Sequence, residues 1–451
     1  MNKIRSWWLL WKQDRLLQKV IRNTGYLFSG NTASMVLNTI MGFMVAILLG
    51  PSQYGALGII IMYASSINRL LSFRMGELVI KYAGHHLAQR ENAHAGSIIK
   101  AAVLSEATVS LLAYFFLLFT ATLAARIFLK DITLAPLIRL YGLMLLANLV
   151  TESATAVLQL NNAYRLQAAL NLFQSLLSFV WAGTVYLTGG GLAAVINAYL
   201  AGKVLMGVGT AIAAYTGFPS LTGVSWRKTP LQLPENWKEM ARFGISTNLS
   251  STINLLIRDS EVLWVGLFLS KVEAGYYKFA LAVMNIILMP VAPLIQTTFP
   301  EISRSASQKN WKPLKAMLGR TTLIAALWTG ACAIGLLIGG KWLLGLISAG
   351  AYLPSLPAIG ILLVGYGLAN ILFWNRPLLL GFGQPGFPLK VSVAVGAVKT
   401  ALMFVLVRPF GYLAQAGLMS AYLAVTVLVN VFKGLSLLRH AAPYQPTGEE
   451  D

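Results

Sequence analysis

The feature that most constrains this chain is a series of apolar segments that continues from one end to the other. Each segment has about 20 residues or more, which is the length that a helix needs to cross the hydrocarbon core of a bilayer. Charged residues make up only 11% of the 451 positions, against roughly 25% in soluble domains. The sequence therefore predicts an all-α integral membrane protein with about twelve transmembrane helices. The expected spans are residues 24–49, 55–80, 97–125, 133–160, 166–188, 192–216, 242–269, 275–300, 320–340, 355–380, 390–408 and 414–436.

The lysines and arginines give the chain a net charge of +20 and lie mainly in alternate loops. The loops 225–242 and 301–320 are strongly basic, whereas connections such as GPSQYG and TGGG are short. Because Lys- and Arg-rich loops stay in the cytoplasm, we expect both termini there. We attribute the charge to contact with anionic lipid head groups rather than with nucleic acid. The basic segment 1–23 is expected to be either an amphipathic helix at the membrane surface or a disordered tail, and 438–451 a cytoplasmic tail.

A weak internal repeat divides the spans into two sets. Gly55 follows the turn between the first two spans, Gly275 follows the turn between the seventh and the eighth, and they lie about half the chain length apart. Both halves begin on the same side of the membrane, so the repeat is a parallel one about an axis along the membrane normal. We expect two six-helix lobes around a central cavity, an N-lobe at 24–216 and a C-lobe at 242–437, joined by the cytoplasmic loop 217–241.

The seventh span carries three charges near its middle, Arg258, Asp259 and Glu261. Ionisable groups are costly at membrane depth, and they usually line a cavity or a pathway there. On a regular helix Arg258 and Glu261 share one face, and Asp259 points about 100° away. Two interpretations follow: a self-neutralising pair that packs against a neighbouring helix, or a polar lumen inside the bundle. We favour the lumen.

Further charges fall within the expected spans: Arg69, Arg74, Arg139, Lys203, Arg376, Lys399, Glu77, Glu106 and Glu152. For Arg74, Glu77, Lys203 and Lys399 we favour the interpretation that the side chains lie near a helix end and reach the head groups. This is least expected for Arg258 and Asp259, which lie in the middle of their span. An excess of cations suits an anionic cargo, and arginine binds phosphate groups bidentately. The arginines expected to bind a diphosphate are Arg258, Arg69, Arg139, Arg74 and Arg376. The acids expected to balance charge, or to couple transport to H+ or Na+, are Asp259, Glu261, Glu152 and Glu77.

The sequence lacks the common signatures of catalysis and of metal binding. Cys332 is the one cysteine, and the four histidines, His85, His86, His94 and His440, form no metal-ligand motif. No P-loop, HExxH or GxSxG pattern occurs, which argues against an ATPase or a hydrolase. We therefore expect no catalytic residue, no metal and no cofactor.

Two segments carry a resemblance to a known family. LLGPSQYGALGII, at 48–60, and RDSEVLWVGLFLSKVEAGYYKFALAVMNIILMPVAPLIQTTFPEIS, at 258–303, resemble the Wzx-type polysaccharide-export flippases of the multidrug/oligosaccharidyl-lipid/polysaccharide superfamily. The resemblance implies a V-shaped bundle of two lobes around a cationic cavity. It also implies that a polyprenyl-diphosphate-linked oligosaccharide, an O-antigen, capsule or exopolysaccharide unit, crosses the bacterial inner membrane without ATP. Membrane lipids and other polysaccharide-assembly membrane proteins are the implied partners.

Several alternatives stay open at this point. A drug/cation antiporter of the same superfamily needs a lumen dominated by unpaired acids, whereas basic residues are in excess here. A peptidoglycan-precursor flippase often has helices beyond twelve, which the sequence does not predict. A polytopic glycan polymerase or ligase is an enzyme and needs a sizeable outer loop with nucleophilic or acid/base groups, and the expected outer loops are short. A structural scaffold would leave the charges at membrane depth unexplained.

Overall fold

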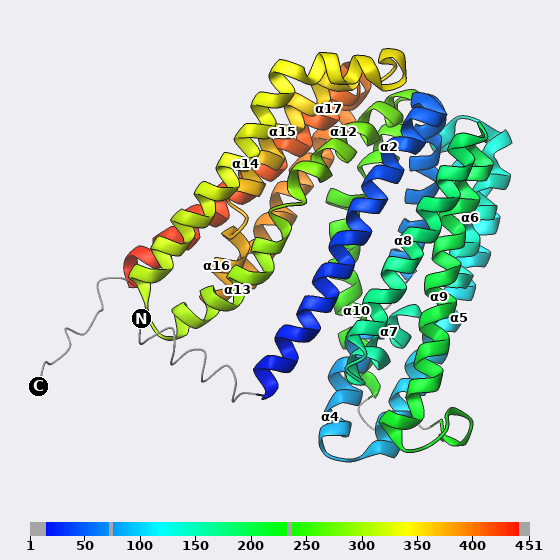
Figure 1. The fold of residues 1–451 in the computed structure, drawn as a ribbon, viewed down its shortest axis with the longest axis vertical. Coiled ribbons are helices and arrows are strands. Elements are labelled where there is room, and N and C mark those ends of the chain that lie inside the picture. The colour runs from blue at the N-terminus through cyan, green and yellow to red at the C-terminus, as the bar shows by residue number, and fades with distance from the viewer. Residues whose placement is uncertain (1–14, 72–74, 232–236, 442–451) are drawn as a thin grey trace, which may run out of the picture. The chain divides into compact units, whose positions relative to one another are not determined.

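The computed structural model describes residues 15–71, 75–231 and 237–441, and within them it contains helices and no strands. The all-α prediction is therefore confirmed (Figure 1). The predicted segments 1–23 and 438–451 lie largely outside the described residues. The elements of the first half are α2 (Arg15–Leu71), α3 (Met75–Leu78), η1 (Val79–Ala83), α4 (Gly84–Ala88), α5 (Asn92–Ala124), η2 (Ala125–Leu129), η3 (Ile132–Leu134), α6 (Ala135–Ala147), α7 (Thr151–Leu160), α8 (Tyr164–Leu187), α9 (Leu192–Thr222) and η4 (Trp226–Lys228).

The second half contains long helices interrupted at several points. Its elements are α10 (Trp237–Asn254), η5 (Leu255–Asp259), α11 (Glu261–Phe268), α12 (Lys271–Leu288), α13 (Ala292–Ser307), α14 (Trp311–Leu346), η6 (Ile347–Gly350), α15 (Ser355–Ile371), α16 (Asn375–Gly381) and α17 (Gly386–Ala441).

Two of the longest helices contain a turn. The backbone leaves the helical region at Gly50 in α2 (φ 64°) and at Gly411 in α17 (φ 71°). Positive φ suits glycine, because a Cβ would be strained there. A continuous helix of 57 residues would be about 85 Å long, far more than the roughly 30 Å of a bilayer core. Each of these helices therefore supplies two of the predicted spans.

Eight stretches of the described chain are long and apolar enough to cross a membrane. Two of them, Ser29–Ala88 and Gly386–His440, contain the expected turn regions and count as two crossings each. The segments α10–α11 and α12–α13 add the seventh and eighth predicted spans, although charges and helix breaks make them shorter or less apolar. The total agrees with the prediction of about twelve helices.

Two predicted spans have a break in the middle. Pro354, Pro357 and Pro377 in the sequence predict a bend in the tenth span, whereas the break in the fourth was not predicted. The fourth span is split between α6 and α7, and the tenth between α15 and α16. Hydropathy does not detect these breaks because the residues on both sides are apolar. The two breaks lie in the fourth span of each set of six, as we expect for an internal repeat.

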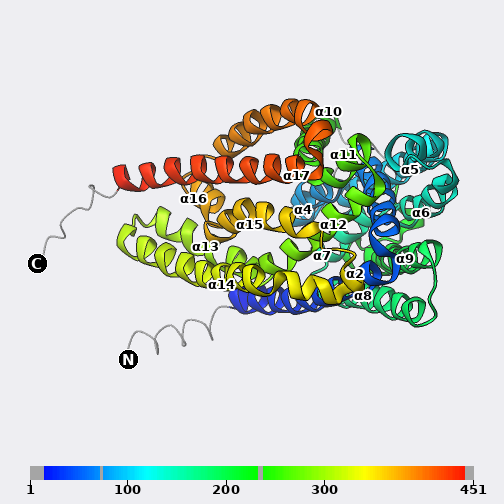
Figure 2. The same ribbon diagram turned by 90° about the horizontal axis from the view of Figure 1, so that it is seen from above.

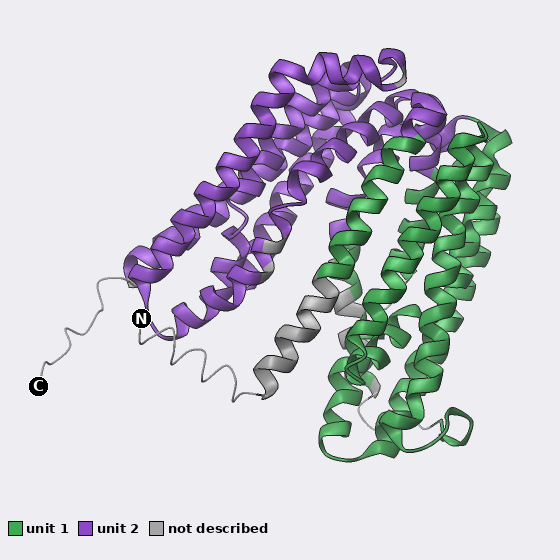
Figure 3. Ribbon diagram, viewed as in Figure 1, with its two compact units in different colours: residues 1–45, 60–126, 131–252 green, residues 46–59, 127–130, 253–451 purple. Residues whose placement is uncertain are grey.

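The chain forms two compact units (Figure 3). Unit 1 comprises residues 1–45, 60–126 and 131–252, and unit 2 comprises 46–59, 127–130 and 253–451. In unit 1, α8 packs on α9, α7 on α9 and α5 on α6; in unit 2, α15 and α16 pack along α17 (Figure 2). The predicted lobe boundaries, 24–216 and 242–437, stay a prediction, because contact and not chain order defines the units.

The two glycine turns of the repeat lie against each other within unit 2. A Cβ on Gly55 would stand 1.8 Å from the carbonyl oxygen of Lys271, and one on Gly275 would stand 1.9 Å from that of Pro51. The approach is reciprocal, so both positions need glycine for the same reason. Beside them the Lys278 ammonium lies 4.0 Å from the centre of the Tyr54 ring. The repeat noticed in the sequence thus corresponds to a close backbone contact.

Candidate functional site

The seventh predicted span contains a π-helical turn at the charged residues. This turn, η5, separates α10 from α11, and Ser260 after it is not helical (φ −93°, ψ 20°). A π turn disturbs the regular pattern of backbone hydrogen bonds, and such turns are frequent at functional sites. Two of its carbonyl groups accept side-chain donors: Ile257 O accepts from Lys399 Nζ at 2.6 Å, and Leu256 O from Trp264 Nε1 at 3.2 Å.

Glu261 lies at the centre of a buried polar cluster in unit 2. Its carboxylate forms an ion pair with Lys399, and it accepts hydrogen bonds from Tyr277 Oη at 2.5 Å and from Gln415 Nε2 at 2.9 Å. The Glu261 and Lys399 side chains are only 2% and 4% exposed. Removing one partner of such a pair leaves an uncompensated charge in a low-dielectric interior, which is strongly destabilising.

The cluster corrects two of the interpretations made from the sequence. Lys399 does not reach the head groups, since its ammonium is held inside unit 2. Glu261 is paired with Lys399 from α17, whereas a regular helix would have placed it on one face with Arg258. The π turn and the non-helical Ser260 remove the regular 100° step between positions 258 and 261. Arg258 is exposed and Asp259 is half-buried.

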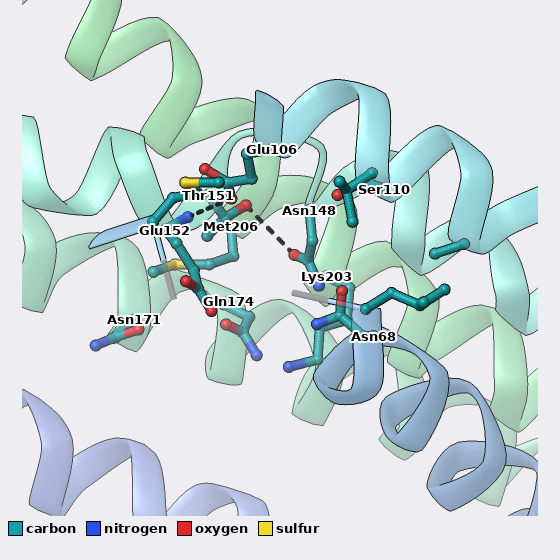
Figure 4. A pocket seen from close by; sticks show the side chains of 14 residues that line it. Asn68, Glu106, Ser110, Asn148, Thr151, Glu152, Asn171, Gln174, Lys203 and Met206 are labelled. Carbon is teal, nitrogen blue, oxygen red and sulfur yellow. Dashed lines mark hydrogen bonds between the residues drawn. The ribbon is translucent and has the colours of Figure 1, made fainter. Parts of the chain in front are cut away.

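Unit 1 contains a polar cavity of about 290 Å³ (Figure 4). It is formed by α2, α3, α5, α8, α9, the start of α7 and the break between α6 and α7, all within the candidate spans. Its apolar lining comes from Leu71, Met75, Val109, Ala113 and Met206. Its polar lining comes from Asn68, Glu106, Ser110, Asn148, Thr151, Glu152, Asn171, Gln174 and Lys203.

Glu106 holds the broken fourth span in place. The side chain is 7% exposed, and its two oxygens accept the backbone N–H groups of Glu152 at 2.8 Å and Ser153 at 2.9 Å. These groups belong to the first turn of α7, where a helix has unsatisfied donors and a partial positive charge. The break between α6 and α7 creates this helix start, and the buried carboxylate satisfies it.

The cavity also corrects the interpretation of Lys203. Its side chain is half-buried and lines the cavity beside Asn68 rather than reaching the head groups (Figure 4). Glu152, a predicted coupling or balancing residue, lines the same cavity. Glu106 and Lys203 were noticed in the sequence but were not placed in the predicted site. The sequence signal for both residues is a charge within an apolar span. The sequence alone does not show that the two helices that carry them line one cavity.

The remaining predicted site residues are spread over the two units. Arg69, Arg139, Arg376 and Glu77 are exposed, and Arg139 Nη2 donates to Thr122 Oγ1 at 2.9 Å. Arg74 lies outside the described residues. Arg69 and Arg139 belong to unit 1, and Arg258 and Arg376 to unit 2, so a common diphosphate site stays a prediction.

Three of the four histidines, His85, His86 and His94, cluster at the turn between α4 and α5. The His86 and His94 rings stack with centroids 5.8 Å apart, and His86 Nδ1 lies 2.6 Å from Glu91 Oε2. This hydrogen bond holds the pKa of the Glu91 carboxyl below its usual range. Among the described residues no group of three His, Cys, Asp or Glu side chains is arranged to hold a metal ion.

Comparison with solved structures identifies the class of fold. The chain is similar to an inward-facing multidrug resistance MATE transporter of the MOP superfamily, with a TM-score of 0.72 at 15% identity over 92% of this chain and 96% of that one. It is similar to the lipid II flippase MurJ in an inward closed conformation, with a TM-score of 0.69 at 13% identity over 94% and 93%. A MOP superfamily transporter from Pyrococcus furiosus gives 0.63 at 14% over 94% and 96%. The fold is that of MOP superfamily transporters, and its apolar helices make this a multi-pass membrane protein.

The family model for polysaccharide biosynthesis proteins matches residues 44–357. The chain belongs to this family, a polysaccharide flippase family of the MOP superfamily. No curated protein matches the chain. The family resemblance found in the two sequence segments is thereby confirmed.

Proposed function

We propose that the protein is a flippase that moves a polyprenyl-diphosphate-linked oligosaccharide from the cytoplasmic to the outer leaflet of a bacterial inner membrane. The cargo is a repeat unit of an O-antigen, capsule or exopolysaccharide. In this topology both termini are cytoplasmic, because the basic loops lie on that side. Movement follows alternating access, with the polyprenyl tail remaining in lipid.

The observation that carries the proposal is the polar cavity of unit 1. Its lining includes Lys203, Glu152 and several amides, from the interior of apolar spans. Charged and hydrogen-bonding groups are too costly to face hydrocarbon, so such a cavity opens to water. A glycan needs a hydrated path across the bilayer, because in hydrocarbon its hydroxyl groups would lose their hydrogen bonds to water.

Exposed arginines support the proposal that the protein binds its cargo through the diphosphate group. Arg258 follows Ile257 in the π turn, and Lys399 fixes that turn by its bond to Ile257 O. A guanidinium group presented by a fixed backbone can bind two phosphate oxygens at once and keeps its charge at any physiological pH. We assign Arg258 as the first diphosphate contact, with Arg69, Arg139, Arg74 and Arg376 as further candidates. H+ or Na+ acting through Asp259, Glu152, Glu77 or Glu261 is the proposed coupling ion.

The family match favours this function over its rivals. A drug/cation antiporter fits poorly with a polysaccharide family and with an excess of basic residues. A glycan polymerase or ligase needs catalytic groups in an outer loop, whereas the connections Thr188–Gly191 and Leu269–Ser270 are short.

A leaflet-access assay tests the proposal. Cells depleted of the protein should accumulate lipid-linked glycan that a membrane-impermeant glycosidase, added to spheroplasts, cannot reach. Re-expression of the wild type should restore access, and Arg258→Ala should lower it at least about tenfold because the diphosphate loses a bidentate contact. Arg320→Ala, an exposed arginine outside the predicted site, is the matched control.

Depletion of the protein and the Arg258→Ala variant test two different claims. Full access without the protein would reject the flippase function. Full access with Arg258→Ala, at wild-type protein level, would reject only the diphosphate assignment.

A further inference from the structure

The size of the cavity in unit 1 limits what it can hold. Its volume is about 290 Å³, at the lower end of the roughly 300–1,000 Å³ of small-molecule pockets. This space suits a single small ring, and an oligosaccharide or a polyprenyl chain would extend beyond it. The occupant is therefore one small molecule or one residue of a larger one.

The charges of the lining exclude strongly charged occupants. Glu106 already accepts two backbone N–H groups, which offset its charge. The remaining carboxylate, Glu152, and the ammonium of Lys203 balance each other in formal charge. A diphosphate would meet the carboxylate of Glu152, and an organic cation would meet the ammonium of Lys203. A neutral, polar occupant meets no such repulsion.

The hydrogen-bonding groups of the lining favour a polyhydroxylated occupant. The amides Asn68, Asn148, Asn171 and Gln174 come from three separate parts of unit 1, and each offers both donors and an acceptor. Asn171 Nδ2 donates to Asn31 Oδ1 at 3.1 Å. The side chains of Asn68 and Gln174, by contrast, have no hydrogen-bond partner within the part of the chain that the structure describes, although both line the cavity (Figure 4).

The other lining residues offer an apolar surface to a polyhydroxylated ring. Leu71, Met75 and Met206 contribute hydrocarbon and thioether groups beside the amides. A pyranose has hydroxyl groups around its edge and C–H groups on its faces, so it needs both kinds of surface. Orientation by a few polar groups within a partly apolar wall is typical of small-molecule sites.

We propose that this cavity binds one neutral sugar residue, a hexose or an N-acetylhexosamine, of the transported glycan. Asn68 and Gln174 are its hydrogen-bonding contacts, and Lys203 and Glu152 bond to hydroxyl groups on its edge. The inference rests on the proposed flippase function, and it places part of the glycan recognition in unit 1 alone.

Binding of simple sugars to the purified full-length protein in detergent tests this. Saturation-transfer NMR with methyl glucoside and methyl N-acetylglucosaminide should show saturable binding of at least one of them, with a Kd on the order of 1 mM. Gln174→Ala and Asn68→Ala should each weaken that binding about five- to tenfold, the effect of losing one hydrogen bond. Gln308→Ala, an exposed amide between α13 and α14, should leave it unchanged.

Each outcome decides the question. If neither sugar binds the wild type, or if binding is the same in Gln174→Ala and Asn68→Ala as in the wild type, the subsite is rejected. Sodium binding that Glu152→Gln abolishes, without sugar binding, would assign the cavity to a cation and also reject it. The leaflet-access assay in spheroplasts that express the same variants separates this failure from failure of the flippase function, because glycan can still cross when the subsite is absent. Size-exclusion profiles show that each variant is folded.

Discussion

At the scale of single residues, the buried pair of Glu261 and Lys399 decides what the seventh span can do. Lys399 bonds to the carboxylate and to the carbonyl oxygen of Ile257, so one ammonium group joins α17 to the π turn. The charge predicted to face a lumen is instead neutralised inside unit 2. Arg258 is left as the exposed charge of this turn. The pair therefore fixes the backbone next to Arg258, and Glu261 bonds to side chains of unit 2.

Substitution of this pair should have strongly non-additive effects on stability. Lys399→Met or Glu261→Gln alone leaves a buried charge unpaired and should cost about 3–5 kcal/mol, whereas the double variant should recover most of that loss. The apparent Tm of detergent-purified protein measures this. Lys390→Met, an exposed lysine on the same helix, should change the apparent Tm little. Additive losses in the double variant would contradict an ion pair.

At the scale of elements, the helices are interrupted where the charges and the cavity lie. The break between α6 and α7 supplies the N–H groups that Glu106 accepts, and the π turn supplies the carbonyl that Lys399 reaches. An unbroken helix has no free backbone groups in its interior, so it could not offer these bonds. The interruptions are therefore part of both sites.

The paired glycine turns provide a test at the same scale. Gly55→Ala or Gly275→Ala places a methyl group within 2 Å of a carbonyl oxygen of the opposite turn. Since backbone must move to admit it, each variant should cost about 3 kcal/mol or more, at the upper end of overpacking effects.

Thermal unfolding of the purified variants measures this cost. The control is Gly42→Ala, also in α2, where an added Cβ meets nothing within 4 Å. Alanine has the higher helix propensity, so this control should be neutral or slightly stabilising. Equal behaviour of Gly42→Ala and Gly55→Ala would contradict the tight contact.

At the scale of the whole molecule, the source of energy for transport is the open question that an experiment can answer. The sequence carries no P-loop, and Asp259 and Glu152 lie half-buried within membrane-spanning segments. Carboxylates in such positions commonly bind protons or ions during transport. We therefore predict that an ion gradient, and not ATP, drives the flippase.

Ionophores distinguish the possibilities in spheroplasts. A protonophore or a sodium ionophore should stop the appearance of glycan in the outer leaflet, and the one that acts identifies the ion. Depletion of ATP with the gradients maintained should not stop it. Transport at the full rate with both gradients collapsed would show that no ion is coupled.

The helices and their number were predictable because hydropathy is a local property. The spans around Gly50 and Gly411 could be separated in the sequence, since Pro51 follows Gly50 directly and Pro409 lies two residues before Gly411. The family could be recognised for a similar reason, because its two segments are continuous in the chain. The lobe boundaries and the central cavity stay predictions.

The composition of the sites could not be predicted in the same way. Glu261 and Lys399 lie far apart in the sequence, as do Glu106, Glu152 and Lys203, and a charge in an apolar span does not indicate which helix carries its partner. A π turn also shifts the facing of every residue after it, which helical periodicity cannot anticipate. The sequence by itself determined that the chain crosses a membrane many times and carries charges there. Only the tertiary structure decided which of those charges are paired, because burial and dielectric depend on neighbours brought together by folding.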